Sequence, residues 1–155
     1  MSSSEELYSL LVPLDGERLI VPRACVAEVV RYTPPERDPG SHDWLLGGYN
    51  WNGRVLPVVA FEGVLGNEMP SITGRTRIVV FVATSGKLKT GYFGVLTQGF
   101  PQLVRVNEDV LKLEAKDGWA DNAPVFCRVK MINEFPLIPD LEQLESMVAD
   151  ESSQD

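Results

Sequence analysis

The chain has 155 residues, of which 44% are hydrophobic and 23% are charged, and its formal net charge is −8. This length suits one ordinary domain or two very small ones and is enough to bury a core. No apolar run approaches the roughly 18–20 residues that a membrane helix needs, and the first ten residues lack the features of a secretory signal. We therefore expect a cytoplasmic protein without direct membrane insertion.

The acidity is concentrated near the C-terminal end. All 14 basic residues lie at or before Lys130, and seven of the 22 acidic residues follow it. The first 133 residues thus carry 15 acids against 14 bases, a net charge near −1. Because neither part has the basic stripe that phosphate binding requires, no nucleic-acid partner is expected.

The first quarter of the chain predicts strands separated by turns. Alternating apolar residues indicate a strand at 8–14, an Asp15-Gly16 turn and a returning strand at 18–21. Residues 26–32 are rich in β-branched side chains and predict another strand. The segment 33–43 that follows has three prolines and a glycine, so it predicts a loop.

A β-hairpin is predicted next. Two short apolar runs, 44–51 and 54–59, flank Asn52-Gly53, and both of these residues tolerate the positive φ of a tight hairpin turn. Pro57 lacks an N–H, so its strand is expected at a sheet edge or a bulge. Residues 60–66 predict a short helical turn that ends at a glycine.

The second half begins with the clearest strand, 75–83, which is followed by a Ser85-Gly86 turn and a return at 89–96. Further strands are predicted at 103–106 and 125–131, and the segment 107–124 between them is interpreted as a loop.

The C-terminal segment predicts a short amphipathic helix at about 141–148, with Asp140 as its N-cap. The helix is expected to pass into a frayed acidic tail, assigned to 147–155.

A weak internal repeat relates the two halves of the chain. Gly16 and Gly86, both in predicted turns, are 70 residues apart, and Pro57 and Pro136, both in apolar runs, are 79 apart. Two copies of a unit of about five short strands would explain this pattern. Small closed barrels are the expected all-β architecture, because closure removes exposed strand edges.

Few residues suggest chemistry. His42 is the only histidine and lies in a loop, which argues against a histidine triad or a multi-histidine metal site. Cys25 and Cys127 are expected to be buried free thiols, although a single disulfide is possible. Residues 71–76 lack the first glycine and the lysine of a phosphate loop. No metal, cofactor or catalytic residue is expected, but a pair of carboxylates brought together in space stays open.

The aromatic residues around the predicted hairpin have two interpretations. Trp44, Tyr49 and Trp51 cluster there, and alternation places Tyr49 and Trp51 on one face. They could pack in the core, or they could form a partner-binding face together with Arg54, because Trp, Tyr and Arg commonly anchor interfaces.

The order of these residues resembles the central motif of CheW-like domains, the couplers of bacterial chemosensory arrays: Gly47, Asn50, Gly53, Pro57, Val58, Leu65 and Gly66. The segments at 19–30 (LIVPRACVAEVV), 94–104 (GVLTQGFPQLV) and 135–144 (FPLIPDLEQL) also resemble parts of that family. The resemblance covers nearly the whole chain, and we assign residues 7–146 to a CheW-like domain.

The resemblance implies a fold of two intertwined five-stranded SH3-like barrels with a short C-terminal helix. It also implies a non-catalytic adaptor that links the cytoplasmic tip of methyl-accepting chemoreceptors to the regulatory domain of a CheA-type histidine kinase, at membrane-associated arrays. One barrel would pack against the kinase, and a groove between the barrels would receive the receptor. The residues expected to bind partners are Glu28, Val29, Val30, Tyr49, Asn50, Trp51, Asn52, Gly53, Arg54 and Pro57.

Three positions depart from the family pattern. Asn52 stands where the family usually has arginine, and Ala60 and Gln98 stand where it commonly has aspartate. Such divergent chains resemble accessory couplers of systems that govern type IV pilus twitching motility. The alternative functions are a small-ligand-binding or hydrolytic β-barrel protein, and a structural scaffold whose aromatic face is only core.

Overall fold

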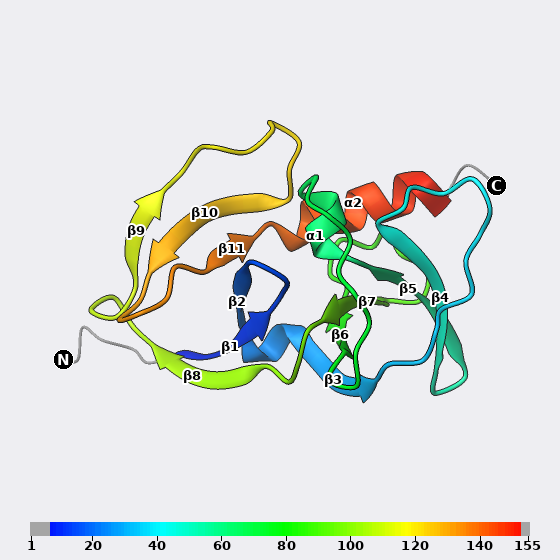
Figure 1. Cartoon of the computed structure of the whole chain (residues 1–155), viewed down its shortest axis with the longest axis horizontal. Coiled ribbons are helices and arrows are strands. Elements are labelled where there is room, and N and C mark those ends of the chain that lie inside the picture. The colour runs from blue at the N-terminus through cyan, green and yellow to red at the C-terminus, as the bar shows by residue number, and fades with distance from the viewer. Residues whose placement is uncertain (1–6, 153–155) are drawn as a thin grey trace.

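Two β-sheets organise the computed structural model, which describes residues 7–152 (Figure 1). The strands are β1 (Leu7–Pro13), β2 (Arg18–Pro22), β3 (Val26–Arg31), β4 (Leu45–Trp51), β5 (Arg54–Val59), β6 (Arg77–Val82), β7 (Tyr92–Thr97), β8 (Gln102–Val106), β9 (Lys112–Ala115), β10 (Val125–Lys130) and β11 (Leu137–Pro139). The helices are the 3₁₀ turn η1 (Arg23–Cys25), α1 (Phe61–Val64) and α2 (Leu141–Ser152).

The all-β prediction with two subdomains and a C-terminal helix is confirmed. Sheet A has six strands in the order β8-β1-β2-β11-β10-β9, and sheet B has five in the order β3-β6-β7-β5-β4. The sixth strand of sheet A is β9, which lies in the segment predicted as a loop. It is four residues long, mostly exposed, and pairs with β10 at the edge of the sheet, so it has no apolar alternation to reveal it.

The internal repeat appears in the topology as an exchange of strands. The hairpin β1–β2 pairs with β8, which comes from the second half of the chain, and the hairpin β6–β7 pairs with β3, which comes from the first half. The two parallel pairings also join the halves: β2 of the first half pairs with β11 of the second, and β7 of the second half pairs with β5 of the first. Gly16 and Gly86 both adopt φ of 79° in the turns of the two hairpins. Each sheet therefore contains strands from both halves of the chain.

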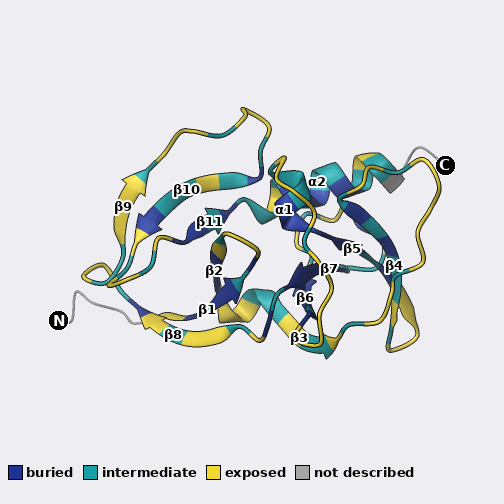
Figure 2. Cartoon of the chain, viewed as in Figure 1, coloured by how far each residue is buried: buried dark blue, intermediate teal, exposed yellow. Residues whose placement is uncertain are grey.

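Three apolar clusters hold this arrangement together. One lies between the sheets and includes the fully buried Phe61, Phe81 and Phe93, and the other two lie within sheet B and within sheet A. Figure 2 shows the buried residues concentrated in the central strands, whereas the tip of the β4–β5 hairpin is exposed. Each strand buried on both faces contributes to two clusters, as β1 does with Val12 and Leu11.

Helix α2 is longer than predicted and includes the first residues of the expected acidic tail. It extends to Ser152 because Leu144 and Val148 are fully buried in the cluster between the sheets. The predicted N-cap is confirmed, since Asp140 Oδ1 accepts the Gln143 N–H at 3.1 Å. Residues 147–152 therefore do not fray; the remainder of the predicted tail, 153–155, lies outside the described residues.

The hairpin prediction is confirmed, but the placement of Pro57 is wrong. Strand β5 lies between β4 and β7 rather than at an edge, and Pro57 faces Gly48 of β4. The parallel pairing with β7 joins Val58 and Val59 to their partners, so Pro57 lies just outside that ladder and its missing N–H is tolerated. The nearest irregularity in pairing lies in β4, between Leu45 and Gly47.

Candidate partner-binding site

The tip of the β4–β5 hairpin is a two-residue turn with both central residues at positive φ. Asn52 has φ of 50° and Gly53 has φ of 79°, the pattern of a type I′ turn. Asparagine adopts this region more readily than most side chains, which gives a local reason for Asn52 where the resemblance suggests arginine. Asn50, Asn52, Gly53 and Arg54 are all exposed at this tip.

The predicted aromatic residues join the two edge strands of sheet B. Trp51 Nε1–H donates to Glu28 Oε1 at 2.9 Å, and the Tyr49 hydroxyl donates to the Arg31 carbonyl at 3.2 Å. Both rings also pack against the buried cluster within sheet B. Core packing therefore accounts for much of each ring, and their role in binding partners stays a prediction.

Arg54 is held in place beside the same aromatic group. Its guanidinium lies over the Tyr92 ring at 5.3 Å and donates to the Thr90 carbonyl at 3.1 Å, while Tyr92 meets Trp51 edge-on at 4.8 Å. An exposed charge fixed by a ring and a carbonyl is preorganised, which lowers the entropy cost of contacting a partner.

The structure brings together most of the residues predicted as a binding site. Glu28, Val29 and Val30 lie in β3, whose edge meets the Tyr49 and Trp51 side chains. Glu28 is exposed, whereas Val29 and Val30 are half-buried and pack against two different clusters. The apolar floor that these two valines were expected to supply is therefore only partly accessible.

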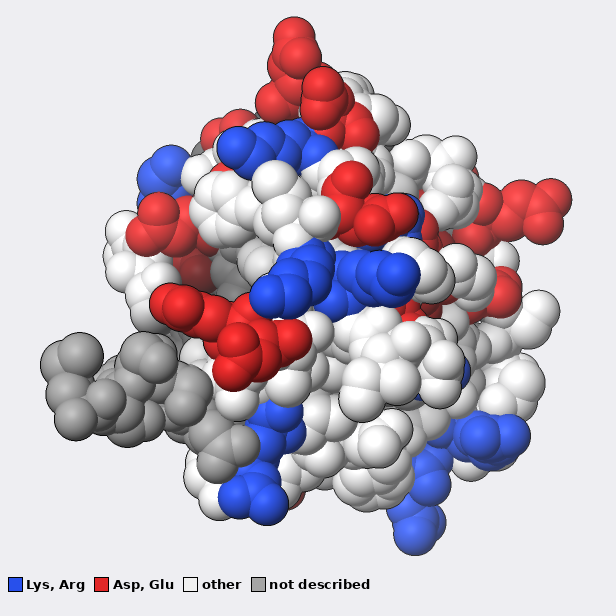
Figure 3. All heavy atoms as spheres, turned by 90° about the vertical axis from the view of Figure 1, so that its left-hand side faces the viewer, with Lys and Arg blue, Asp and Glu red and all other residues white. Residues whose placement is uncertain are grey.

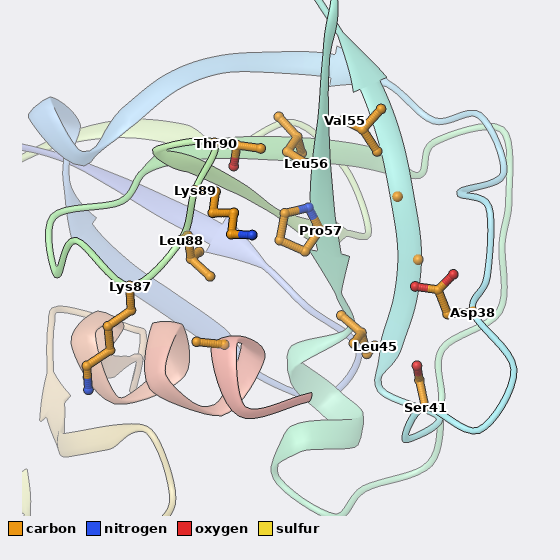
Figure 4. A pocket seen from close by; sticks show the side chains of 13 residues that line it. Asp38, Ser41, Leu45, Val55, Leu56, Pro57, Lys87, Leu88, Lys89 and Thr90 are labelled. Carbon is orange, nitrogen blue, oxygen red and sulfur yellow. The ribbon is translucent and has the colours of Figure 1, made fainter. Parts of the chain in front are cut away.

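The sequence did not reveal an apolar groove of about 420 Å³ on the other side of the hairpin (Figure 4). Pro57 is the one residue of the predicted site that lines it. The other lining residues come from the 38–41 loop, β4, β5, the β6–β7 turn and α2: Asp38, Ser41, Leu45, Gly47, Gly48, Val55, Leu56, Lys87, Leu88, Lys89, Thr90 and Ala149. No strand of sheet A contributes to this lining, so this groove is distinct from the groove between the barrels that the resemblance implied for the receptor.

The groove combines an exposed apolar side chain with charged rims. Val55 is 63% exposed, and alternation along β5 could have placed it opposite the buried Leu56. Lys89 extends from the β6–β7 turn toward Pro57, and Asp38 lies across the groove from Lys87 (Figure 4). The Lys87 Nζ donates to Ser146 Oγ of α2 at 2.6 Å, which fixes that rim.

Glu62 and Glu145 are buried, and the sequence singled out neither of them. Glu62 Oε2 accepts the Asp15 N–H at 2.8 Å, while Glu145 accepts the N–H groups of Thr84 and Ser85. Burial raises the pKa of the Glu62 carboxyl, and hydrogen bonding to the Asp15 N–H opposes this effect. Each carboxylate accepts hydrogen bonds from the turn of a hairpin, so both have structural partners.

A family model described as a CheW-like domain matches residues 9–147. The chain belongs to the CheW-like domain family. Among solved structures, its fold is similar to that of the scaffolding protein TtCheW from Thermoanaerobacter tengcongensis, with a TM-score of 0.75 and 17% identity over 90% of this chain and 88% of that chain. Comparison of the sequence with curated proteins gives no match.

Two of the departures from the CheW-like pattern occupy buried surroundings. Ala60 is fully buried in the cluster within sheet B, where its N–H donates to the Trp44 carbonyl. Gln98 Nε2 lies 3.5 Å from Glu62 Oε2, at the margin of a hydrogen bond. This CheW-like domain therefore has an apolar side chain and an amide at the two aspartate positions, and a buried carboxylate at Glu62.

The remaining titratable side chains do not gather into a metal site. Within residues 7–152, no group of three His, Cys, Asp or Glu side chains could hold a metal ion. Cys25 and Cys127 are free thiols but half-buried rather than buried, and burial raises the pKa of the Cys25 thiol. His42 is exposed and its ring stacks on Trp44 at 5.6 Å, while its backbone N–H donates to Glu151 Oε1 at 3.0 Å.

The end of this CheW-like domain formed by sheet A shows mixed charge. Lys and Arg side chains lie interspersed with Asp and Glu on this face, rather than forming a stripe of one sign (Figure 3). Neither α-helix of the described chain is both long enough and apolar enough to cross a membrane.

Proposed function

We propose that this chain is a non-catalytic adaptor of a bacterial chemosensory system, acting in the cytoplasm at membrane-associated receptor arrays. It would link the cytoplasmic tip of methyl-accepting chemoreceptors to the regulatory domain of a CheA-type histidine kinase. The observation that carries this proposal is the CheW-like match over residues 9–147 together with a two-sheet fold similar to a CheW scaffolding protein.

The groove beside the hairpin supports a role in binding a polypeptide. Its floor includes Val55, Leu56 and Pro57, and its rims carry Lys89 and Asp38. An apolar floor with charged rims suits a protein partner, because the apolar centre supplies affinity and the rims supply orientation and rate. Contacts of this size are individually weak. An array holds many of them together, and the high effective concentration raises the overall affinity.

The rival function, a small-ligand-binding or hydrolytic barrel, requires an enclosed pocket with converging polar groups. The lining of the groove mixes apolar side chains with Asp38, Ser41, Lys87, Lys89 and Thr90. The rival predicts turnover or saturable binding of a small molecule that is lost when one polar side chain, such as Asp38, is replaced. The adaptor predicts that Asp38→Asn changes only the affinity for a protein partner.

Binding to purified partners tests the adaptor directly. The cognate kinase regulatory domain and a receptor cytoplasmic fragment are each immobilised, and the chain is passed over them by surface plasmon resonance. Saturable binding to at least one of them is expected. Absence of binding to both would overturn the proposal.

Two matched variants locate the surface. Val55→Glu places a charge in the groove and is expected to weaken partner binding at least tenfold without changing the fold. The control is Leu113→Glu, which alters a similarly exposed side chain (57% exposed) on β9 of sheet A. Equal losses in both variants would show that the groove is not the docking surface. Trp51→Phe provides a third arm, because it tests the predicted hairpin face.

A narrower assignment is an accessory coupler of a system that controls type IV pilus twitching motility. It rests on Asn52, Ala60 and Gln98, which replace the residues usual in CheW-like couplers. Asn52 removes a cation from the exposed hairpin tip, where a typical coupler would present arginine. Deleting the gene should then reduce twitching while leaving swimming unchanged, and restoring arginine with Asn52→Arg should alter receptor preference. Normal twitching after deletion would exclude this subtype and leave the adaptor role intact.

A further inference from the structure

Glu62 is a buried carboxylate with incomplete hydrogen bonding. It is the second residue of α1 and is 1% exposed. Its Oε2 accepts the Asp15 N–H at 2.8 Å and lies 3.5 Å from Gln98 Nε2, whereas Oε1 has no hydrogen-bond partner among the described residues. Buried oxygens are nearly always bonded, so this one needs an explanation.

Three segments from both sheets meet at this side chain. Helix α1 follows β5 of sheet B, Asp15 lies in the β1–β2 turn of sheet A, and Gln98 begins the linker that passes from β7 in sheet B to β8 in sheet A. The linker is tied to the same turn by its backbone, because the Gln98 N–H donates to the Pro13 carbonyl at 2.9 Å. One carboxyl group therefore contacts both sides of a crossing between the sheets.

The ionised form of Glu62 is poorly suited to this place. A buried carboxylate needs several donors to replace its water. The donors at Glu62 are the Asp15 N–H, its own backbone N–H and the marginal Gln98 amide, and they leave Oε1 without a partner among the described residues. Among the described residues, the charged group that acts on it is Asp15, which is also negative, and the neighbouring Gln98 is neutral. Loss of water raises the pKa of Glu62 above its ordinary value of 4.5, and the Coulomb effect of Asp15 acts in the same direction.

We propose that Glu62 is a pH-dependent latch between the two sheets. With the carboxyl group neutral, the junction of α1, the β1–β2 turn and the β7–β8 linker is closed. When the carboxyl group ionises, the junction loosens, because opening gives the charge access to water. This device acts within the chain and goes beyond the proposed adaptor function.

The latch reaches the surface through the linker. Phe100 lies two residues after Gln98, is 65% exposed, and has the Arg77 guanidinium over its ring at 5.4 Å. Because the linker is short, a change in the Gln98 backbone bond shifts this exposed aromatic ring relative to Arg77 of β6. A proton at the buried junction is thereby coupled to an apolar contact on the surface.

The coupling has a definite size. If the open junction ionises at the ordinary pKa and the closed junction at a higher one, the opening equilibrium constant rises about tenfold per pH unit between the two values and then levels off. Amides that exchange only from the open junction must lose protection by the same factor. The Gln98 N–H is the direct reporter, because its bond to Pro13 closes the linker.

The experiment is a ¹⁵N NMR titration of the chain alone from pH 4 to pH 8. The Asp15 amide, bonded to Glu62, should shift with a midpoint above 4.5. The protection factor of the Gln98 amide, corrected for intrinsic exchange, should fall about tenfold per pH unit up to that midpoint. In Glu62→Gln both changes should vanish, with Gln98 protected throughout.

The matched control is Glu145→Gln, which alters the other buried glutamate and should leave the Asp15 midpoint in place. A midpoint at or below 4.5 would overturn the latch, and so would constant Gln98 protection while Glu62 ionises. Should Glu62→Gln fail to fold, Asp15→Asn replaces it: removing the like charge should lower the midpoint and move the loss of protection with it. No partner is present, so these outcomes are independent of whether the chain binds a kinase or a receptor.

Discussion

The two halves of the chain follow one plan but end in different helices. In the first half, β5 leads into α1, which has four residues; in the second, β11 leads into α2, which has 12. In each helix, a buried glutamate accepts a hydrogen bond from the first hairpin turn of its own half: Glu62 from the Asp15 N–H, and Glu145 from the Ser85 N–H. The same connection therefore occurs twice, across the two sheets.

The two connections differ in how completely they are bonded. Glu145 uses both oxygens, accepting from the Thr84 and Ser85 N–H groups and from the Ser85 hydroxyl. Glu62 uses one oxygen well and leaves the other unbonded. A buried carboxylate with both oxygens bonded is better compensated for its lost water than one with an unbonded oxygen. One topology therefore carries both a fully bonded junction and an incompletely bonded one.

The largest expected effects come from removing the buried apolar side chains of the two helices. Leu144 is fully buried in the cluster between the sheets, so Leu144→Ala should lower the free energy of unfolding by about 2–5 kcal/mol. Urea denaturation measures the change. The matched variant in the short helix is Phe61→Ala, expected to cost about 3–5 kcal/mol. A small loss for Leu144 alone would mean that α2 is not essential to the junction of the sheets.

The next effect separates the two glutamates. Glu145→Gln replaces one accepting oxygen by a donor that faces N–H groups, so it should cost about 1.5–3 kcal/mol at pH 7. Thermal and urea unfolding at pH 7 measure this cost. Glu145→Gln should also expose the Ser85 amide to hydrogen exchange. A cost no larger than that of Glu62→Gln would contradict the difference in bonding on which the comparison depends.

Much of this fold could be predicted from the sequence because turns and alternation have local causes. Asp15-Gly16, Asn52-Gly53 and Ser85-Gly86 marked three hairpins, and the structure places all three. The C-terminal end of α2 was less accessible, because no apolar periodicity continues after Val148 and Ala149 packs against the cluster between the sheets. Strand β9 was missed for the same reason, since its pairing with β10 is what makes it a strand.

The candidate site was less predictable than the fold. Alternation placed Tyr49 and Trp51 on one face, but their hydrogen bonds to β3 depend on strands distant in sequence. The groove was missed because Val55 becomes part of it only when the β6–β7 turn and α2 lie beside β5. Glu62 was missed because nothing in its neighbours shows that a helix of four residues will be buried at a crossing of two sheets.

The β4–β5 hairpin of the first half and the equivalent β10–β11 hairpin of the second half differ in the length of their turns. Strands β4 and β5 are joined by two residues, whereas β10 and β11 are joined by residues 131–136. Gly53→Val forces a β-branched side chain to φ near 79° and should cost about 1–3 kcal/mol. Asn133→Val in the longer loop should change stability by less than about 0.5 kcal/mol. Melting temperatures of the two variants test this, and equal values would count against a strained turn at Gly53.

The smallest expected effect at neutral pH, and the sharpest test of the comparison, is Glu62→Gln. The pKa of Glu62 is raised in the folded chain, so its contribution to stability is full below the ordinary value of 4.5 and is lost as pH rises through the folded pKa. Over that window the free energy of unfolding of the wild type should fall by up to about 1.4 kcal/mol per pH unit relative to the variant. At pH 7, glutamine still offers an acceptor to the Asp15 N–H without a buried charge, so the variant should match or exceed wild-type stability. Urea unfolding at half-unit steps from pH 4 to pH 8 measures both curves, and parallel curves would show that Glu62 keeps its ordinary pKa and that the two junctions respond to pH alike.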